Sequence, residues 1–314
     1  MGAVGRAFAK LILFGEHAAV YGHPAVGITL PQSTVASLED PGAADWDLDS
    51  LPVEDREAVR RVLARVEASL PALAARGRCA VHLQSSIPRK AGFGSSAALC
   101  GALARAALAR AAEDADDLSR AWAIAHDAER LFHGTPSGVD TGLSLLGGTC
   151  VLRPRPPGLP EHQVIPRRGI HLVAGAVQRD AACAALVGGL AGRMSSGDQV
   201  VREAIGELGA LADSAAGVLQ AGAPDAAAAL GSLADRAMAA LRGIGLSTPD
   251  LEVVLEAAGR AGALGAKLSG AGGGGAFYAI APDRDSALDI GARITSTARA
   301  AGIQLLFGVQ MLQA

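Results

Sequence analysis

The chain has 314 residues, enough for one large or two ordinary domains, and half of them are hydrophobic, which allows a substantial core. The net charge of −3 disfavours a general attraction to nucleic acid or to anionic membranes, but it still allows a local basic pocket for a phosphorylated ligand. The four cysteines lie far apart without a Cys-x-x-Cys pair, and no apolar run is long enough to span a membrane, so we expect a cytoplasmic protein with reduced thiols.

Strands and helices are mixed in the first half of the chain. Apolar segments bounded by glycine and proline turns indicate the strands, and longer alanine-rich segments indicate the helices. In chain order we expect strands at 4–14 and 24–37, a helix at 52–76, a strand at 79–86, and helices at 95–112 and 117–133. After a turn the chain continues through 139–146 and returns as a strand near 148–153.

The second half is richer in helices. The proline-rich stretch from Pro154 to Pro160 is the best candidate for a linker between the halves. Beyond it we expect a strand at 170–177, helices near 198–221, 224–242 and 249–261, a strand at 276–281, a helix at 284–301 and a strand at 304–312. Because both halves combine strands with helices, the sequence predicts an α+β protein of two packed domains.

A glycine-rich turn leads directly into a long alanine-rich helix in the segment Pro88-Arg-Lys-Ala-Gly-Phe-Gly-Ser-Ser-Ala-Ala98. Exposed backbone N–H groups at such a turn, together with the positive end of the helix dipole, form a site for phosphate. Ser95 and Ser96 fall where the helix begins, as caps or as metal ligands. The segment predicts a nucleotide-phosphate site in a phosphoryl-transfer enzyme, although the chain has neither a P-loop motif nor protein-kinase signatures.

Glu129 lies in the middle of an apolar stripe on its predicted helix. The other members of that stripe are Leu118, Trp122, Ala125 and Phe132. An ionised carboxylate that faces a core is costly unless it is paired or bound to a metal ion. Two interpretations stay open: a buried salt bridge, for example to Lys10 or to an arginine, and a magnesium ligand that faces the phosphate site.

Asp140 follows a Pro-Ser-Gly turn and also has two interpretations: an N-cap for the segment beginning at Thr141, or a catalytic base. Lys10 lies near a Gly-Glu-His turn, where it is either solvated or neutralises a charge. His126 and Glu129 have the i,i+3 spacing that some metal sites use. Because no second such pair occurs, a transition-metal site is disfavoured.

The segment Lys267-Leu-Ser-Gly-Ala-Gly-Gly-Gly-Gly275 contains a run that formally matches G-x-G-x-x-G. A dinucleotide fingerprint leads into a helix, whereas this run leads into an apolar strand, so the match is weak. The alternative of a free, flexible turn is entropically unfavourable with five glycines in six residues. We therefore expect the run to approach a ligand, or the first glycine loop, closely.

Three segments, in this order along the chain, resemble the GHMP kinases, the family of galactokinase, homoserine kinase, mevalonate kinase and phosphomevalonate kinase. They are Lys10-Leu-Ile-Leu-Phe-Gly-Glu-His17 and the two glycine-rich segments described above, and the resemblance spans Lys10 to Phe277. The Val-Tyr-Gly that continues the first segment is most similar to mevalonate kinases, since galactokinases have Thr-Asp there. The segment Glu129-Arg-Leu-Phe-His-Gly-Thr-Pro-Ser-Gly-Val-Asp140 is similar to theirs as well.

The resemblance implies a fold and an activity. The fold would comprise an N-terminal domain of the ribosomal S5 domain 2-like type over 1–165 and a ferredoxin-like C-terminal domain over 166–314, with the active site in the cleft between them. The activity would be ATP- and Mg²⁺-dependent phosphorylation of the 5-hydroxyl of mevalonate, by a protein that binds neither nucleic acid nor membrane, and a homodimer is allowed. The alternatives are a kinase for phosphomevalonate or a sugar, and a non-catalytic ligand sensor.

The resemblance also implies roles for individual residues. Asp140 would take the proton of the substrate hydroxyl with Lys10 beside it, and Ser96 and Glu129 would hold Mg²⁺. The ATP phosphates would lie against Pro88, Lys90, Ala91, Gly92, Phe93, Gly94, Ser95, Ser96, Ala97, Gly272 and Gly273. The substrate would contact Glu16, His17, Gly270 and Ala271. Many mevalonate kinases have a threonine near Asp180, and its absence here bears on substrate affinity.

Overall fold

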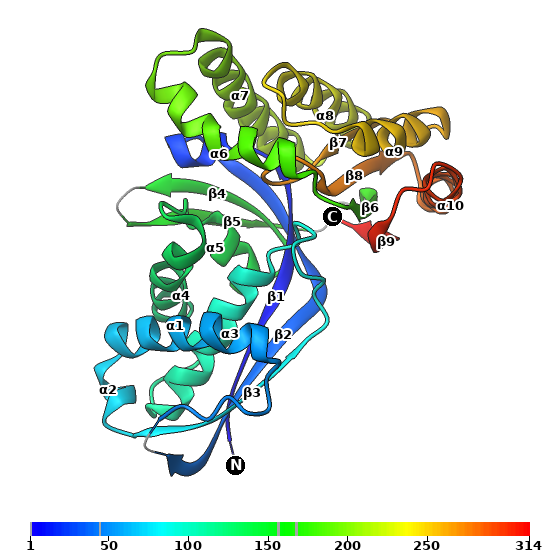
Figure 1. The fold of residues 1–314 in the computed structure, drawn as a ribbon. Coiled ribbons are helices and arrows are strands. Elements are labelled where there is room, and N and C mark those ends of the chain that lie inside the picture. The colour runs from blue at the N-terminus through cyan, green and yellow to red at the C-terminus, as the bar shows by residue number, and fades with distance from the viewer. Residues whose placement is uncertain (1, 44, 156–157, 167–168) are drawn as a thin grey trace.

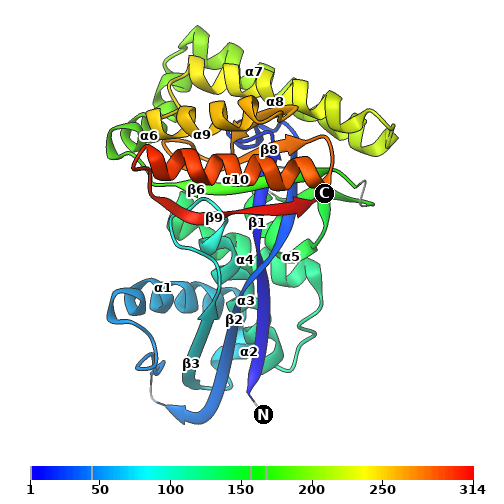
Figure 2. The same cartoon turned by 90° about the vertical axis from the view of Figure 1, so that its right-hand side faces the viewer.

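A computed structural model describes residues 2–43, 45–155, 158–166 and 169–314. Two antiparallel sheets follow one another along the chain, and helices pack against each of them (Figures 1 and 2). The α+β class is therefore confirmed. The first sheet ends at residue 165 and the second begins at residue 171, while the domain boundary at 165/166 stays a prediction.

The N-terminal sheet has five strands: four follow the order β1-β2-β4-β5, and β3 also pairs with β2. They are β1 (Ala3–Phe14), β2 (Ala25–Ala43), β3 (Arg78–Ser85), β4 (Thr149–Arg155) and β5 (Gly158–Ile165). Because β2 is long, β4 pairs with it near its start and β3 pairs with it further along. The β1–β2 ribbon thereby reaches from the N-terminus to the second sheet (Figure 1).

Helices cover one face of this sheet (Figure 1). They are α1 (Val53–Ser69), the short α2 (Pro71–Ala74), α3 (Ser95–Arg110), α4 (Leu118–His133) and α5 (Val139–Leu146). Helix α3 lies directly on β1 and β2, and α4 packs beside it. The packing of α3 is close because small residues meet: a Cβ on Gly5 would lie only 2.2 Å from the carbonyl oxygen of Ala102. This close approach holds the middle of α3 against β1.

The C-terminal sheet has the strand order β7-β8-β6-β9. Its strands are β6 (His171–Val177), β7 (Gly265–Leu268), β8 (Gly275–Ala281) and β9 (Leu305–Gln313). The helices of this half are α6 (Ala181–Ser195), α7 (Gln199–Ala221), α8 (Ala226–Gly243), α9 (Pro249–Arg260) and α10 (Arg284–Ala300). Helix α10 packs on β6 and β9, and α8 packs on β7. Helix α7 also contacts β2, so it links the two halves.

The predicted linker is wrong. Pro154 lies in β4 and Pro160 lies in β5, and these strands pair with each other in the N-terminal sheet, while residues 156–157 lie outside the described residues. Strand β5 is the last in the strand order, and β2 pairs with β4 only at residues 149–152. Prolines are tolerated there because an edge strand, or the end of a ladder, leaves backbone N–H groups without a partner strand.

The secondary structure differs from the prediction at three further places. The helix expected at 52–76 is divided, because Pro71 cannot continue α1 and instead begins α2. Helix α6 was not predicted, since Gly188, Gly189 and Gly192 reduce its helix propensity. Strand β7 was not predicted either: it has only four residues, and one of them is a lysine.

A seam of polar contacts joins the end of β1 to the C-terminal sheet. The Tyr278 hydroxyl donates to the carbonyl oxygen of Leu13 at 2.6 Å, and the Ser269 hydroxyl donates to that of Ile12 at 2.7 Å. All these groups are buried, so each donor needs the partner that the other half provides.

Among the described residues, no helix combines the length and the apolar character that a membrane span requires.

Candidate active site

The glycine turn before α3 is built from left-handed backbone conformations. Lys90, Gly92 and Gly94 have φ values of 59°, 92° and 76°. Gly94 is the N-cap residue of α3, and among the described residues no side-chain cap hydrogen bond is made at that end of the helix. The alternative that Ser95 or Ser96 caps the helix is therefore wrong. The N–H groups of the first turn of α3 stay available for an anion, as the helix dipole favours.

Glu129 extends from α4 toward the start of α3. Its side chain is 1% exposed, and its Oε1 accepts a hydrogen bond of 3.0 Å from the Ser96 hydroxyl. Burial, and then the nearby negative charge of Asp140, raise the pKa of Glu129 to about 8. Its other oxygen, Oε2, is buried and has no hydrogen-bond partner among the described residues. The structure shows no salt bridge from Glu129 to Lys10 or to a described arginine, so these two partners are ruled out, whereas His133 lies 3.5 Å from Oε1 and forms an ion pair with it when protonated.

Lys10 and Asp140 form an ion pair beside Glu129. The Lys10 Nζ lies 2.9 Å from Asp140 Oδ1, and the lysine side chain is 4% exposed against 32% for the aspartate. A Cβ on Gly94 would lie 2.7 Å from Lys10 Cγ, so the glycine lets the lysine stem pass directly against the phosphate turn. Asp140 is the second residue of α5, whose N-cap is Gly138, so the N-cap interpretation of Asp140 is wrong.

The second glycine run packs closely against backbone atoms of other segments. A Cβ on Gly274 would lie 2.3 Å from the carbonyl oxygen of Gln178, and one on Gly272 would lie 2.8 Å from that of Leu246. A Cβ on Gly92 of the first loop would lie 3.0 Å from the backbone N of Ala276. The expected close approach of the two glycine loops is therefore seen, and the interpretation of the run as a free turn is wrong.

The loop after β1 contacts the second glycine run. The Nε2 of His17 lies 3.0 Å from the carbonyl oxygen of Ala271, an arrangement in which Nε2 carries the proton and donates. The adjacent Glu16 is buried and forms an ion pair with Lys267, which also donates to the carbonyl oxygen of Leu268 at 2.7 Å. The Glu16 carboxylate is thus already paired at the junction of the two sheets.

His17 leads to a prediction on pH dependence. Burial is the largest cause that lowers the pKa of His17 from 6.5 to about 4. Between these pH values the unfolded chain binds more protons, so the stability from a neutral His17 is fully present above pH 6.5 and is lost as the pH falls toward 4. We expect the stability advantage of the wild type over His17→Gln to shrink by up to about 3 kcal/mol across this window.

The measurement is urea unfolding of both proteins at several pH values. Comparing the two proteins at each pH cancels the titration of every other group that both share. Parallel pH profiles for the two proteins would contradict the prediction.

Other predicted site residues lie in or next to the first loop. Phe93 packs on Phe307 of β9, with ring centroids 4.6 Å apart, and its carbonyl oxygen accepts from the backbone N–H of Lys10 at 3.0 Å. The Lys90 carbonyl oxygen accepts from Arg179 Nε at 3.1 Å. Ala91 and Ala97 are buried, whereas Pro88 and Lys90 are more accessible. On the other loop, Gly270 has no atom within 4 Å of an added Cβ, and the Gly273 carbonyl oxygen accepts from the Asp180 N–H at 2.8 Å.

Sequence reasoning missed three ionisable residues at this site. His133 lies 3.5 Å from Glu129, Lys267 pairs with Glu16, and Arg179 reaches the phosphate turn. A signal existed for two of them: His133 follows Glu129 by one helical turn, and Lys267 is the one charge in the otherwise apolar segment Gly265–Leu268. His126, the histidine that the sequence did suggest, lies instead near Gly138, 3.5 Å from an added Cβ there.

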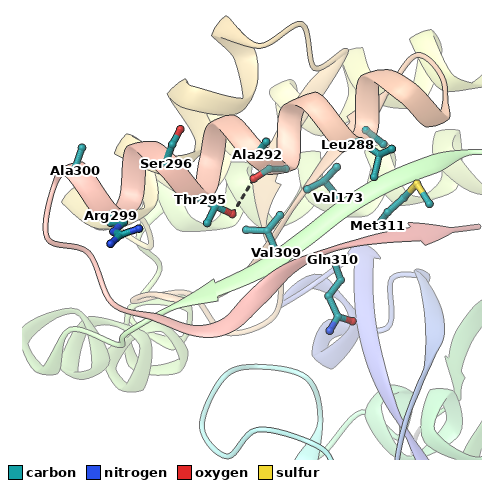
Figure 3. Close-up of a pocket in the computed structure, with 12 residues that line it drawn as sticks. Val173, Leu288, Ala292, Thr295, Ser296, Arg299, Ala300, Val309, Gln310 and Met311 are labelled. Atoms are coloured by element: carbon teal, nitrogen blue, oxygen red, sulfur yellow. Dashed lines mark hydrogen bonds between the residues drawn. The ribbon is translucent and has the colours of Figure 1, made fainter.

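A cavity of about 760 Å³ lies elsewhere, between α10 and strands β6 and β9 (Figure 3). Its lining is largely apolar, with Arg299 and no carboxylate. Gln310 points to the opposite side of the sheet, where its Oε1 accepts from Gln32 Nε2 at 2.9 Å. Because the cavity lacks an acid or base, it does not offer the groups that a phosphoryl transfer needs.

Comparisons with known proteins agree with this arrangement. The sequence matches the family profile "GHMP kinases N terminal domain" over residues 57–148 and "GHMP kinases C terminal" over residues 223–300. The chain belongs to the GHMP kinase family, and the resemblance noted from its motifs is confirmed. The two profiles fall on the two halves that the sheets define.

Several named relatives are mevalonate kinases. The chain is 30% identical to mevalonate kinase of Pyrococcus horikoshii over 303 residues, covering 88% of both chains. Its fold is similar to that of L. major mevalonate kinase in complex with R-mevalonate, with a TM-score of 0.74, 24% identity and coverage of 100% and 96%. It is also similar to Streptococcus pneumoniae phosphomevalonate kinase, with a TM-score of 0.78, 17% identity and coverage of 99% of both chains. At such identities the two structures support the fold alone.

Proposed function

We propose that this kinase transfers the γ-phosphoryl group of ATP to the 5-hydroxyl of mevalonate. The observation that carries the proposal is the Lys10–Asp140 ion pair, which lies between the phosphate turn and the buried Glu129. Phosphoryl transfer requires a base, a cation beside it, an anion site and a carboxylate for a metal ion. Asp140, Lys10, the phosphate turn and Glu129 provide these groups in that order.

The nucleotide phosphates would bind at the first glycine loop. Backbone N–H groups of residues 92–97 and the dipole of α3 would face them, and Gly272 and Gly273 would approach from the other loop. Pro88, Lys90, Ala91 and Phe93 would shape the turn. The uncapped start of α3 and its left-handed glycines support this assignment.

The residues present fit a divalent cation. Glu129 has one oxygen that accepts from the Ser96 hydroxyl and a second, buried oxygen without a partner among the described residues, which a cation would satisfy. Carboxylate and hydroxyl oxygens are ligands that Mg²⁺ prefers. When bound, the ion would neutralise charge between the β- and γ-phosphates of ATP.

Asp140 would accept the proton of the substrate hydroxyl as that oxygen attacks the γ-phosphorus. Lys10 would stabilise the ionised carboxylate and the developing negative charge on the attacking oxygen. The fold positions both side chains: Lys10 is a buried residue of β1, and Asp140 lies in the first turn of α5. The remainder of the catalysis would be positioning, because the transfer needs little covalent chemistry from the protein.

The choice of mevalonate rests on the names of the relatives and on the substrate-side residues. His17, in the loop after β1, contacts Ala271 of the second glycine run, and Gly270 is the residue before Ala271. Glu16 would act there through its pair with Lys267. A phosphomevalonate kinase is the alternative, since one such enzyme has the same fold. A sugar kinase is less well supported, because no motif of the chain predicts a polyol pocket. A non-catalytic sensor is less well supported, because Lys10, Ser96, Glu129 and Asp140 are all present.

The experiment is Mg²⁺-dependent ADP release from ATP with mevalonate, phosphomevalonate, galactose and homoserine compared side by side. We expect strong release with mevalonate alone. Release with only another acceptor would keep the chemistry and overturn the substrate. No release with any of the four would favour the sensor.

Glu129→Gln is expected to raise the Mg²⁺ concentration needed for half-maximal activity by about 10- to 100-fold, because a neutral amide is a weaker ligand than a carboxylate. The measurement is activity against free Mg²⁺ at a fixed concentration of ATP. Glu203→Gln, on the exposed face of α7, is the matched control. An unchanged Mg²⁺ dependence of Glu129→Gln would contradict the assignment.

A further inference from the structure

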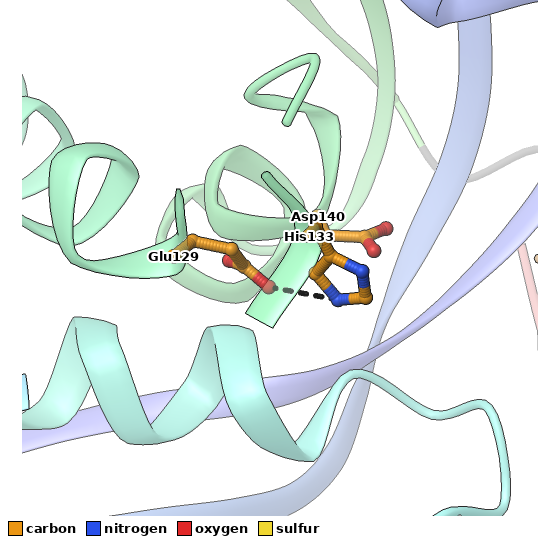
Figure 4. Close-up of side chains that lie close together, drawn as sticks. All are labelled: Glu129, His133 and Asp140. Carbon is orange, nitrogen blue, oxygen red and sulfur yellow. Dashed lines mark ion pairs between the residues drawn. The ribbon is translucent and has the colours of Figure 1, made fainter. Parts of the chain in front are cut away.

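His133 has no role in the proposed transfer, although it faces the centre of the site. It is the last residue of α4, one helical turn after Glu129, and its Nε2 lies 3.5 Å from Glu129 Oε1. Figure 4 shows the imidazole ring beside the carboxylates of Glu129 and Asp140. The ring is 52% exposed, so it can rotate without disturbing the core.

These three side chains offer a set of ligands for one cation. Their ligand atoms all lie within 4.8 Å of one another. Two ligands of the same ion are about 3–4 Å apart when each metal–ligand distance is about 2.1 Å, so a small rotation of His133 closes the set. Lys10 Nζ lies 2.9 Å from Asp140 Oδ1, yet this oxygen has no hydrogen-bond partner among the described residues, and the carboxylate offers one oxygen atom to the set.

A second observation also points to a cation. Oε2 of Glu129 is buried and has no hydrogen-bond partner among the described residues, although the carboxylate as a whole is 1% exposed. An unsatisfied oxygen in the interior is unfavourable, and a bound cation is one of the few partners that relieves it.

We propose that His133 supplies a nitrogen ligand at this site, which therefore binds divalent ions of the first transition row in preference to Mg²⁺, even without nucleotide. Mg²⁺ favours oxygen ligands, whereas imidazole nitrogen favours transition ions. The sequence had disfavoured such a site on the His126–Glu129 spacing, and the fold brings His133 and Asp140 to Glu129 instead. The proposal shares Glu129 with the proposed magnesium site and Asp140 with the proposed base, and it rests on that part of the proposed function.

The test uses Mn²⁺ as the probe, on the full chain without a polyhistidine tag and without nucleotide. Mn²⁺ is the weakest binder of its row, so its binding is a strict test. We expect one bound Mn²⁺ per chain, with coupling to a ¹⁴N nucleus in electron spin-echo envelope modulation spectra. His133→Leu should lose that coupling, bind Mn²⁺ about tenfold more weakly and have a smaller preference for Mn²⁺ over Mg²⁺.

His82→Leu is the matched control, because His82 is exposed on β3 and lies outside this set of ligands. It should retain both the coupling and the affinity, and circular dichroism should show all three proteins folded. Absence of bound Mn²⁺, a wild-type spectrum without ¹⁴N coupling, or coupling that persists in His133→Leu would each overturn the proposal. Coupling without activity on any acceptor would support this proposal and contradict the proposed function.

Discussion

Asp140→Asn is expected to lower turnover by about 10²- to 10⁴-fold while leaving ATP binding nearly unchanged. Asparagine has the shape of aspartate, but its amide cannot accept the proton of the substrate hydroxyl. It also removes the negative partner of Lys10, whose Nζ lies 2.9 Å from the native carboxylate. The phosphate turn and α3 do not depend on this side chain for any described hydrogen bond, so nucleotide affinity should persist.

The measurement is kcat with saturating mevalonate and Mg²⁺-ATP, together with the dissociation constant of ATP by calorimetry. Asp289→Asn, exposed on α10, serves as the control for the loss of a charge. Near-normal turnover in Asp140→Asn would rule out its role as the base. Loss of ATP binding in the same variant would instead indicate that Asp140 supports the nucleotide site.

Lys267→Met is expected to destabilise the fold by about 3–5 kcal/mol. The Lys267 and Glu16 side chains are 0% and 1% exposed, so the lysine is the cation that compensates a buried carboxylate. Burial is the largest influence on both groups: it raises the pKa of Glu16 and lowers the pKa of Lys267. Methionine has a similar volume, and it leaves Glu16 with the electrostatic penalty of burial without a partner.

Urea unfolding of Lys267→Met, Glu16→Gln and the double variant measures this effect. The double variant should be more stable than the sum of the two single changes predicts, because it removes both charges of the pair. Additive losses would mean that the pair contributes no coupling. The readout is stability, so it does not depend on which substrate the enzyme uses.

The local elements were largely predictable from the sequence. Apolar segments and glycine turns located β1, β3, β6 and β8, and alanine-rich patterns located α3, α4 and α10, each within a few residues of its ends. The inward position of Glu129 also followed from its place in the apolar stripe, and the structure confirms that the side chain is buried. These features depend on local propensity and periodicity, which neighbouring residues determine.

Two of the failures share a different cause. The stretch from Pro154 to Pro160 has the composition of a linker, yet β4 and β5 pair there, because an edge position tolerates proline. Strand β7 is too short to have a periodicity, and it becomes a strand because β8 pairs with it. In each case the deciding partner is another strand, which composition alone does not show.

By itself, the sequence determined the glycine loops, the helix that follows the first of them, and the carboxylates that a phosphoryl transfer would use. Only the tertiary structure decided which charges meet: Lys10 with Asp140, His133 and Asp140 around Glu129, and Glu16 with Lys267, 251 residues further along the chain. A glycine turn or a helix follows from contacts within a few residues. An ion pair or a ligand set requires side chains from several elements to meet within a few ångströms, and packing of the two sheets and their helices alone sets those distances.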